Sequence, residues 1–155
     1  MKIKIGVMGS AEEAATPAIA ETARALGQAI AARDGGAFHI GVSPGEDERE
    51  HVETFQMPTD ACDAIVYTGF GLKGRNVILV RSCDVVVFIS GSIGSLNEFT
   101  IAYDEDKIIG CLTGTSGVAD EIESIVETFR KKTKARIVYD DDPARLVERC
   151  LAEVP

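Results

Sequence analysis

The sequence predicts an α/β fold in which a mainly parallel β-sheet lies between two layers of helices. Short apolar runs alternate along the chain with longer segments that carry a helical pattern of apolar residues, and this alternation is typical of a parallel sheet covered by helices. The run 85–89 is apolar at every position, as expected of a strand buried between two helical layers. Small polar residues follow most of these apolar runs, which is the chemistry of strand-to-helix loops.

The individual elements follow from the same patterns. The first helix should begin at Pro17 with Thr16 as its N-cap, because proline suits the first helical position and a threonine oxygen can accept from an unpaired N–H group. The segment 34–36, Asp-Gly-Gly, should end this helix. The expected strands span residues 2–8, 37–42, 64–67, 85–89, 107–112 and 135–139. The other expected helices span residues 73–82, 96–104, 118–132 and 143–152.

Composition limits the partners. The chain has 155 residues and a net charge of −9, which predicts one domain over residues 1–155. Because nonspecific nucleic-acid affinity comes mostly from Lys and Arg, this charge argues against a nucleic-acid partner. We recognise no signal peptide and no apolar stretch near the roughly 20 residues of a membrane helix, so no membrane partner is expected.

Cysteine and histidine do not form a metal-site pattern. The four cysteines include no Cys-x-x-Cys pair, which favours reduced thiols and a cytoplasmic protein. His39 falls within an expected strand and is taken as structural, and His51 stands in an acidic segment that we expect to be solvated. No pair of residues has a recognised zinc or calcium spacing, so neither a metal nor another cofactor is expected.

The loops after the strands should share one edge of the sheet, where parallel α/β sheets bind their ligands. Glycine and serine there let a ligand approach the backbone, and helix N-termini attract phosphate. This edge is therefore predicted to bind a phosphorylated small molecule, with a nucleotide as the expected ligand. The loops are 9–10, 43–45, 68–69, 90–95 and 113–117. The candidate ligand-binding residues are Gly9, Ser10, Ser43, Gly69, Asn76, Gly91, Ser92, Gly94 and Ser95.

The loop 90–95 leaves the most apolar strand and enters a helix through Gly91 and Gly94. It lacks the Gly-Lys-Ser/Thr ending of a Walker loop, and no Gly-x-Gly-x-x-Gly follows the first strand. Neither an ATPase nor an ordinary NAD-dependent dehydrogenase is therefore supported. A phosphate-binding loop and a plain strand-to-helix turn both fit this composition.

Glu98 has two interpretations. The segment 95–98 matches the Ser-x-x-Glu capping box, in which the glutamate bonds back to the N-cap N–H group and starts the helix. Alternatively, the carboxylate faces the ligand, where it could hold ribose hydroxyls or stabilise a positively charged sugar transition state.

Arg75 stands in the first turn of its predicted helix, where the helix dipole disfavours a cation. Either a surface ion pair or a ligand phosphate could compensate for this position. The neighbouring Asn76 either orients the loop or is solvated.

These motifs resemble those of the SLOG superfamily, the Rossmann-like proteins once labelled possible lysine decarboxylases. Its motif is Pro-Gly-Gly-x-Gly-Thr-x-x-Glu, and residues 90–98 keep Gly91, Gly94 and Glu98, with Ser95 in place of the threonine. Residues 68–76 and 82–84 are similar to the family's Thr-Gly-x-x-x-x-Arg-Asn and Ser-x-Asp patterns. With the matching segments 6–10 and 40–44, the resemblance covers nearly the whole chain.

The resemblance implies a Rossmann-like three-layer sandwich. Family members normally have an extra strand, Gly-rich loop and helix between the first helix and the strand leading to Gly41. Here residues 33–36 connect the two directly. This implies either a trimmed form or an absent segment, with a sheet one strand narrower.

The resemblance also implies the possible functions. In lonely-guy phosphoribohydrolases, which split nucleoside 5′-monophosphates into base and ribose 5-phosphate, the matched positions make Arg75 and Glu98 the catalytic pair. Molybdenum-cofactor carrier proteins bind a phosphorylated ligand without turnover, and Ser90 and Ser92 in place of proline and glycine favour binding here. A third alternative is an interaction module with a vestigial pocket. Family proteins usually form homo-oligomers, so a homo-oligomer is expected.

Overall fold

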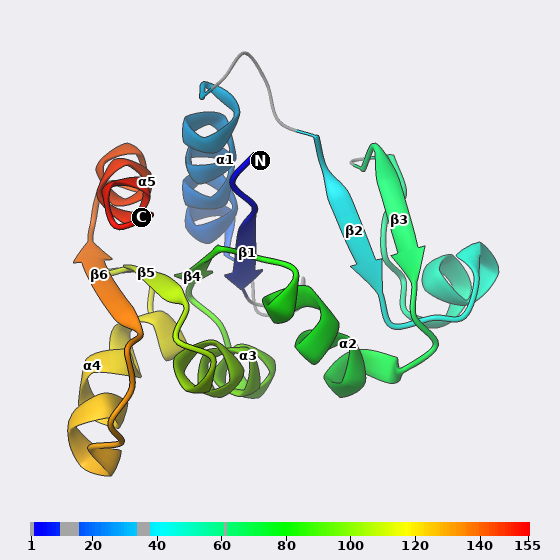
Figure 1. Ribbon diagram of the computed structural model, residues 1–155. Coiled ribbons are helices and arrows are strands. Elements are labelled where there is room, and N and C mark those ends of the chain that lie inside the picture. The colour runs from blue at the N-terminus through cyan, green and yellow to red at the C-terminus, as the bar shows by residue number, and fades with distance from the viewer. Residues whose placement is uncertain (1, 10–15, 34–37, 61) are drawn as a thin grey trace.

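The computed structural model describes residues 2–9, 16–33, 38–60 and 62–155, in which strands and helices alternate (Figure 1). A short π-helix, η2 (Glu50–Thr54), precedes the third strand. The strands are β1 (Ile5–Gly9), β2 (Ile40–Ser43), β3 (Ala64–Tyr67), β4 (Val85–Ile89), β5 (Ile108–Leu112) and β6 (Arg136–Asp140). The helices are α1 (Pro17–Ala31), α2 (Gly71–Arg81), α3 (Ile93–Asp104), α4 (Val118–Phe129) and α5 (Pro143–Ala152).

The strands form two parallel sheets, whereas the sequence predicted a single narrower one. The larger sheet has the order β1-β4-β5-β6, and the smaller one pairs β2 with β3. Figure 1 shows the smaller sheet set apart from β1. Within the described residues, β1 pairs only with β4 and β2 only with β3. Removing a strand from between β1 and β2 would divide a sheet in this way.

Helices cover both faces of the larger sheet, which confirms the predicted α/β layers. On one face, Leu26 of α1 and Leu146 of α5 pack against β4 and β5. On the other, Phe99 of α3 and Ile122 of α4 join the apolar core. Every residue of β4 and β5 is buried, and β4 lies inside the sheet as its sequence predicted.

The helix ends show which local sequence signals were sufficient to predict where a helix begins or ends. The Thr16 hydroxyl accepts from the Ile19 N–H group at 3.3 Å, which confirms the predicted start of α1. In contrast, α2 begins two residues and α3 three residues before their predicted starts. Helix α4 ends at Phe129, earlier than predicted, because Arg130 adopts the left-handed conformation with φ of 48°.

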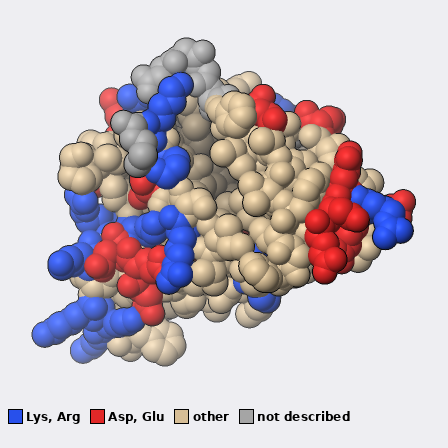
Figure 2. Space-filling view, turned by 45° about the vertical axis from the view of Figure 1, so that its right-hand side comes forward, with Lys and Arg blue, Asp and Glu red and all other residues tan. Residues whose placement is uncertain are grey.

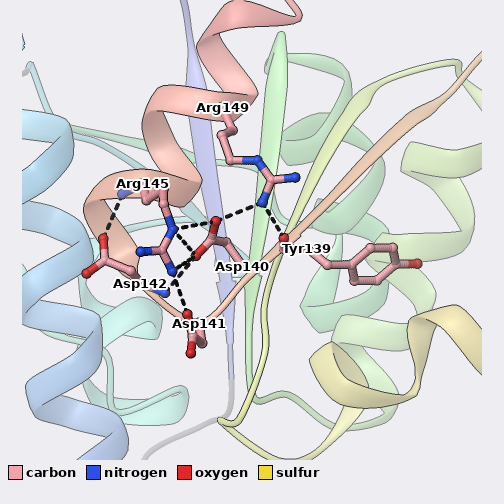
Figure 3. Close-up of polar contacts among 6 residues, drawn as sticks. All are labelled: Tyr139, Asp140, Asp141, Asp142, Arg145 and Arg149. Atoms are coloured by element: carbon pink, nitrogen blue, oxygen red, sulfur yellow. Dashed lines mark hydrogen bonds and ion pairs between the residues drawn. The ribbon is translucent and has the colours of Figure 1, made fainter.

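A carboxylate and two arginines fix the connection between β6 and α5 (Figure 3). Asp140 accepts from Arg145 Nε at 2.9 Å and from Arg149 Nη1 at 2.8 Å. These hydrogen bonds, those of Arg145 first, hold the pKa of Asp140 well below its usual range. Arg149 also donates to the Tyr139 carbonyl oxygen at 2.7 Å. Both guanidinium groups are thus engaged within the fold.

The remaining expectations concern thiols, metals and membranes. All four cysteines are free of disulfides in the structure. The described part of the chain contains no cluster of His, Cys, Asp and Glu suited to a metal ion. None of its helices combines the length and apolar character needed to span a bilayer.

Candidate functional site

The candidate site is built around the loop that joins β4 to α3. Gly91 has a φ of 101°, and a Cβ atom there would lie 2.6 Å from the Ser95 Oγ atom, so this position requires glycine. The Ser95 hydroxyl donates to the Gly9 carbonyl oxygen at 3.1 Å, which ties α3 to the end of β1. Three of the predicted residues therefore meet here; Ser10 lies outside the described residues.

The start of α3 overturns the capping-box interpretation of Glu98. The N-cap is Ser92, so Ser95 lies inside the first turn and cannot serve as the N-cap. Ser92 makes no capping hydrogen bond through its side chain. Among the described residues, the first turn of α3 thus has no side-chain acceptor of the kind that helix starts usually receive, a setting that favours an anionic ligand.

Glu98 and Arg75 lie on adjacent helices at this edge. Glu98 is only 7% exposed, and burial raises its pKa to about 6, opposed by the charges of Arg75 and Lys73. Burial also lowers the pKa of the Arg75 guanidinium, and Glu98 opposes that change. A carboxylate with this pKa can exchange a proton near neutral pH.

Arg75 reaches across to the smaller sheet. Its Nη1 atom donates to the Val42 carbonyl oxygen at 2.8 Å, and its buried Nε atom has no hydrogen-bond partner among the described residues. Arg75 forms no ion pair with a described residue, so the surface-pair interpretation fails there. A buried guanidinium N–H group without a partner is costly, and a ligand oxygen would satisfy it.

Asn76 links α2 to α3 beside Glu98. It is 2% exposed, so the solvated interpretation is wrong. Its amide nitrogen donates to Asn97 Oδ1 at 2.9 Å and approaches the Gly94 carbonyl oxygen at 3.5 Å. Exchanging the two ends of the amide places the nitrogen 3.1 Å from Glu98 Oε1. In either orientation the side chain positions the start of α3.

Lys73 is a site residue that the sequence analysis missed. Its Nζ atom lies 3.4 Å from the position that a Cβ atom on Gly94 would occupy, and its charge acts on Glu98. A helix start at Gly71 places Lys73 one turn before Asn76, on the side that meets α3. The three-residue spacing between Lys73 and Asn76 was the sequence signal that could have identified Lys73 as a site residue.

Ser43 and Gly69 belong to a neighbouring group of internal contacts. The Ser43 hydroxyl accepts from the Gly45 N–H group at 3.0 Å and contacts His51 Nδ1 at 2.8 Å. His51 Nε2 contacts the Pro58 carbonyl oxygen at 3.1 Å, and His51 is buried, contrary to the expected solvated segment. The Gly69 N–H group donates to the Gly45 carbonyl oxygen at 2.9 Å. These residues brace the loop before α2.

The loop 113–117 supports the site without offering a second one. The first N–H groups of α4 donate to the carbonyl oxygens of Ser90 and Gly91 at 2.9 and 3.1 Å. Asp120 accepts from two further N–H groups of the loop. These donors are already used, so a ligand has fewer contacts here than the sequence suggested.

A separate hollow of about 520 Å³ lies around η2. Its lining residues are Glu46, Asp47, Arg49, Glu50, Glu53 and Thr54. Figure 2 shows a cluster of acidic side chains at the right-hand side, next to an uncharged central area. Four carboxylates repel an anion, so this hollow does not suit a phosphorylated ligand.

Comparisons with known proteins agree with this fold. The molybdenum cofactor binding protein from the phototrophic bacterium Rippkaea orientalis is 25% identical, with a TM-score of 0.73 over 98% of each chain. The molybdenum cofactor carrier protein from Chlamydomonas reinhardtii is 22% identical, with a TM-score of 0.67 over 98% of this chain and 100% of that one. The structure of TM1055 is 22% identical, with a TM-score of 0.66 over 96% of this chain and 99% of that one.

No curated protein matches the chain. A family model described as the SLOG cluster4 family matches residues 31–147, a region that includes Arg75, Glu98 and the loop 90–95. This match confirms the resemblance that the sequence motifs indicated: the chain belongs to the SLOG cluster4 family.

Proposed function

We propose that the chain binds a phosphorylated small molecule of the nucleotide type at the edge formed by α2 and the start of α3. The observation that carries the proposal is Arg75, whose buried Nε atom has no partner in the described residues while its Nη1 atom is held by Val42. A fixed guanidinium with a free N–H group is a preorganised phosphate donor.

The neighbouring groups have complementary roles in this proposal. The N–H groups in the first turn of α3 bind phosphate oxygens, aided by the helix dipole. Glu98 accepts hydrogen bonds from ribose hydroxyls, and Asn76 keeps its position next to Glu98 through Asn97. Gly91 and Ser95 hold the loop in the shape that exposes these donors.

The similar structures favour binding over catalysis. Two of them are a molybdenum cofactor binding protein and a molybdenum cofactor carrier protein. The ligands that we propose for this chain therefore include a cofactor of that kind. Self-association and a cytoplasmic location stay predictions.

Isothermal titration with the common nucleoside 5′-monophosphates tests the proposal. Arg75→Ala should weaken binding at least tenfold, because a charge-assisted hydrogen bond contributes about 1.5–3 kcal/mol. Arg81→Ala is the matched control, because this arginine of the same helix pairs with Glu105 on the surface. Absence of binding by the folded wild-type protein would refute the proposal and favour an interaction module.

A second candidate function, hydrolysis of the N-glycosidic bond, is favoured by Glu98. An ionised carboxylate at this position would stabilise the positive ribose as the bond to the base breaks, and water would add its hydroxyl to C1′ and its proton to the base. Chromatography of the same mixtures would detect free base. Release that Glu98→Gln abolishes and Glu148→Gln, an exposed control, preserves would establish the enzyme; binding without release would leave a carrier.

A further inference from the structure

Lys73 brings a second cation to the site. Its amine lies over Gly94, the second residue of α3, 3.4 Å from the place of a Cβ atom. It forms no ion pair with a described residue, although its charge acts on Glu98. Lys73 is exposed, so water solvates its charge. A cation beside a helix N-terminus is still electrostatically unfavourable, and an anion bound there would stabilise the arrangement.

The charges around this point do not balance. Lys73, Arg75 and the N-terminus of α3, which carries roughly half a positive charge, converge on one carboxylate, Glu98. The excess is about one and a half positive charges. A phosphomonoester carries about −1.5 to −2 at pH 7, whereas a phosphodiester carries a single negative charge and a nucleoside none. The monoester matches the excess best.

We propose that Lys73 is a specificity-determining residue of this site, which binds a terminal phosphate and makes the site prefer a phosphomonoester to a phosphodiester. The inference rests on the proposed function and defines the ligand class more narrowly. The ammonium group supplies the second charge, while Arg75 supplies directed hydrogen bonds. Gly94 leaves room for the amine over the backbone of α3.

The test compares adenosine 5′-monophosphate, its methyl ester and adenosine as probes in calorimetric titrations. The methyl ester blocks one phosphate oxygen and removes one ionisation while it keeps the base and sugar. The wild type should bind the monophosphate about tenfold more tightly than the ester. Lys73→Gln should lower affinity for the monophosphate about tenfold and affinity for the ester much less, whereas Lys73→Arg should keep most of the preference.

Lys132→Gln is the matched control, because it removes the same charge from an exposed position beyond α4. If it weakens binding as much as Lys73→Gln does, the effect is one of net charge and the inference is wrong. A wild type that binds both phosphates, with a preference unchanged by Lys73→Gln, would overturn this inference and leave the proposed function intact. A wild type that binds neither would overturn both.

Discussion

The two sheets of the molecule differ in what holds them together. In the larger sheet, β4 and β5 are buried at every residue and helices cover both faces. In the smaller sheet, Ile40 of β2 is 58% exposed and Val66 of β3 is 48% exposed. Polar contacts centred on the buried Ser43 and His51 fix the loops at its end. The larger sheet should therefore carry most of the stability.

The candidate site joins these two regions. Helix α2 contacts both β2 and α3, and Arg75 donates from α2 to the Val42 carbonyl oxygen in the smaller sheet. The loop 90–95 rests on the larger sheet through β4. Ligand binding should thus depend on a rigid part and a more weakly held part at once, and local opening of the smaller sheet would affect the site before global unfolding does.

The largest expected effect contrasts one substitution in the two sheets. Val87→Ala removes two buried carbons from the centre of β4, where the side chain is fully inaccessible, and should lower the free energy of unfolding by about 2–3 kcal/mol. Val66→Ala, in the half-exposed β3, should cost under about 1 kcal/mol. Urea titrations monitored by circular dichroism measure both. Equal losses would mean that the smaller sheet is as tightly packed as the larger one.

The next prediction concerns Glu98, whose position in the site opposes stability. Burial raises its pKa to about 6, above the unfolded value of about 4.3, so the folded state binds the proton more tightly. Glu98 therefore favours folding below about pH 4, and this contribution is lost as pH rises through 6. At pH 7.5, the free energy of unfolding of Glu98→Gln should be about 2 kcal/mol higher than that of the wild type.

In the larger sheet, ionisation of Asp140 should change the stability in the opposite direction, so Asp140 serves as the control. Its hydrogen bonds to Arg145 and Arg149 lower its pKa, so its contribution is present above the unfolded value of about 3.9 and is lost as pH falls below it. Asp140→Asn should be less stable than the wild type at pH 7, and the difference should narrow below about pH 4. Thermal unfolding measured from pH 3 to 8 compares both variants. If the difference in stability between Glu98→Gln and the wild type does not change with pH, burial of the Glu98 carboxylate does not destabilise the fold.

Local patterns were sufficient for much of the fold. The ranges 64–67, 85–89 and 143–152 match the observed β3, β4 and α5, because apolar runs and turn residues delimit them within a few positions. The start of α1 was likewise predicted from Thr16 and Pro17, whose side chains act on the adjacent backbone. These elements depend on neighbours in the sequence, which periodicity and capping rules can read.

The remaining features depend on distant contacts. The division into two sheets follows from the pairing of β1 with β4, about 80 residues away, which no local pattern reveals. Motif spacing pointed to Arg75 and Glu98. It could not reveal that Arg75 donates to the Val42 carbonyl oxygen, because the two residues are 33 positions apart in the sequence. His51 was expected to be solvated because its neighbours are acidic; in η2 its ring points to Ser43 while those neighbours remain mostly exposed.

The smallest expected effect tests whether His51 stabilises only the smaller sheet. His51 Nε2 donates to the Pro58 carbonyl oxygen, which can only accept, and Nδ1 contacts the Ser43 hydroxyl, which also accepts from Gly45. His51→Ala leaves both partners unsatisfied and should lower the free energy of local opening by about 1 kcal/mol. Amide hydrogen exchange should therefore accelerate about fivefold in β2 and β3 and stay unchanged in β4 and β5. His39→Ala, at an exposed histidine just before β2, should change neither, and acceleration spread over both sheets would mean that they open as one unit.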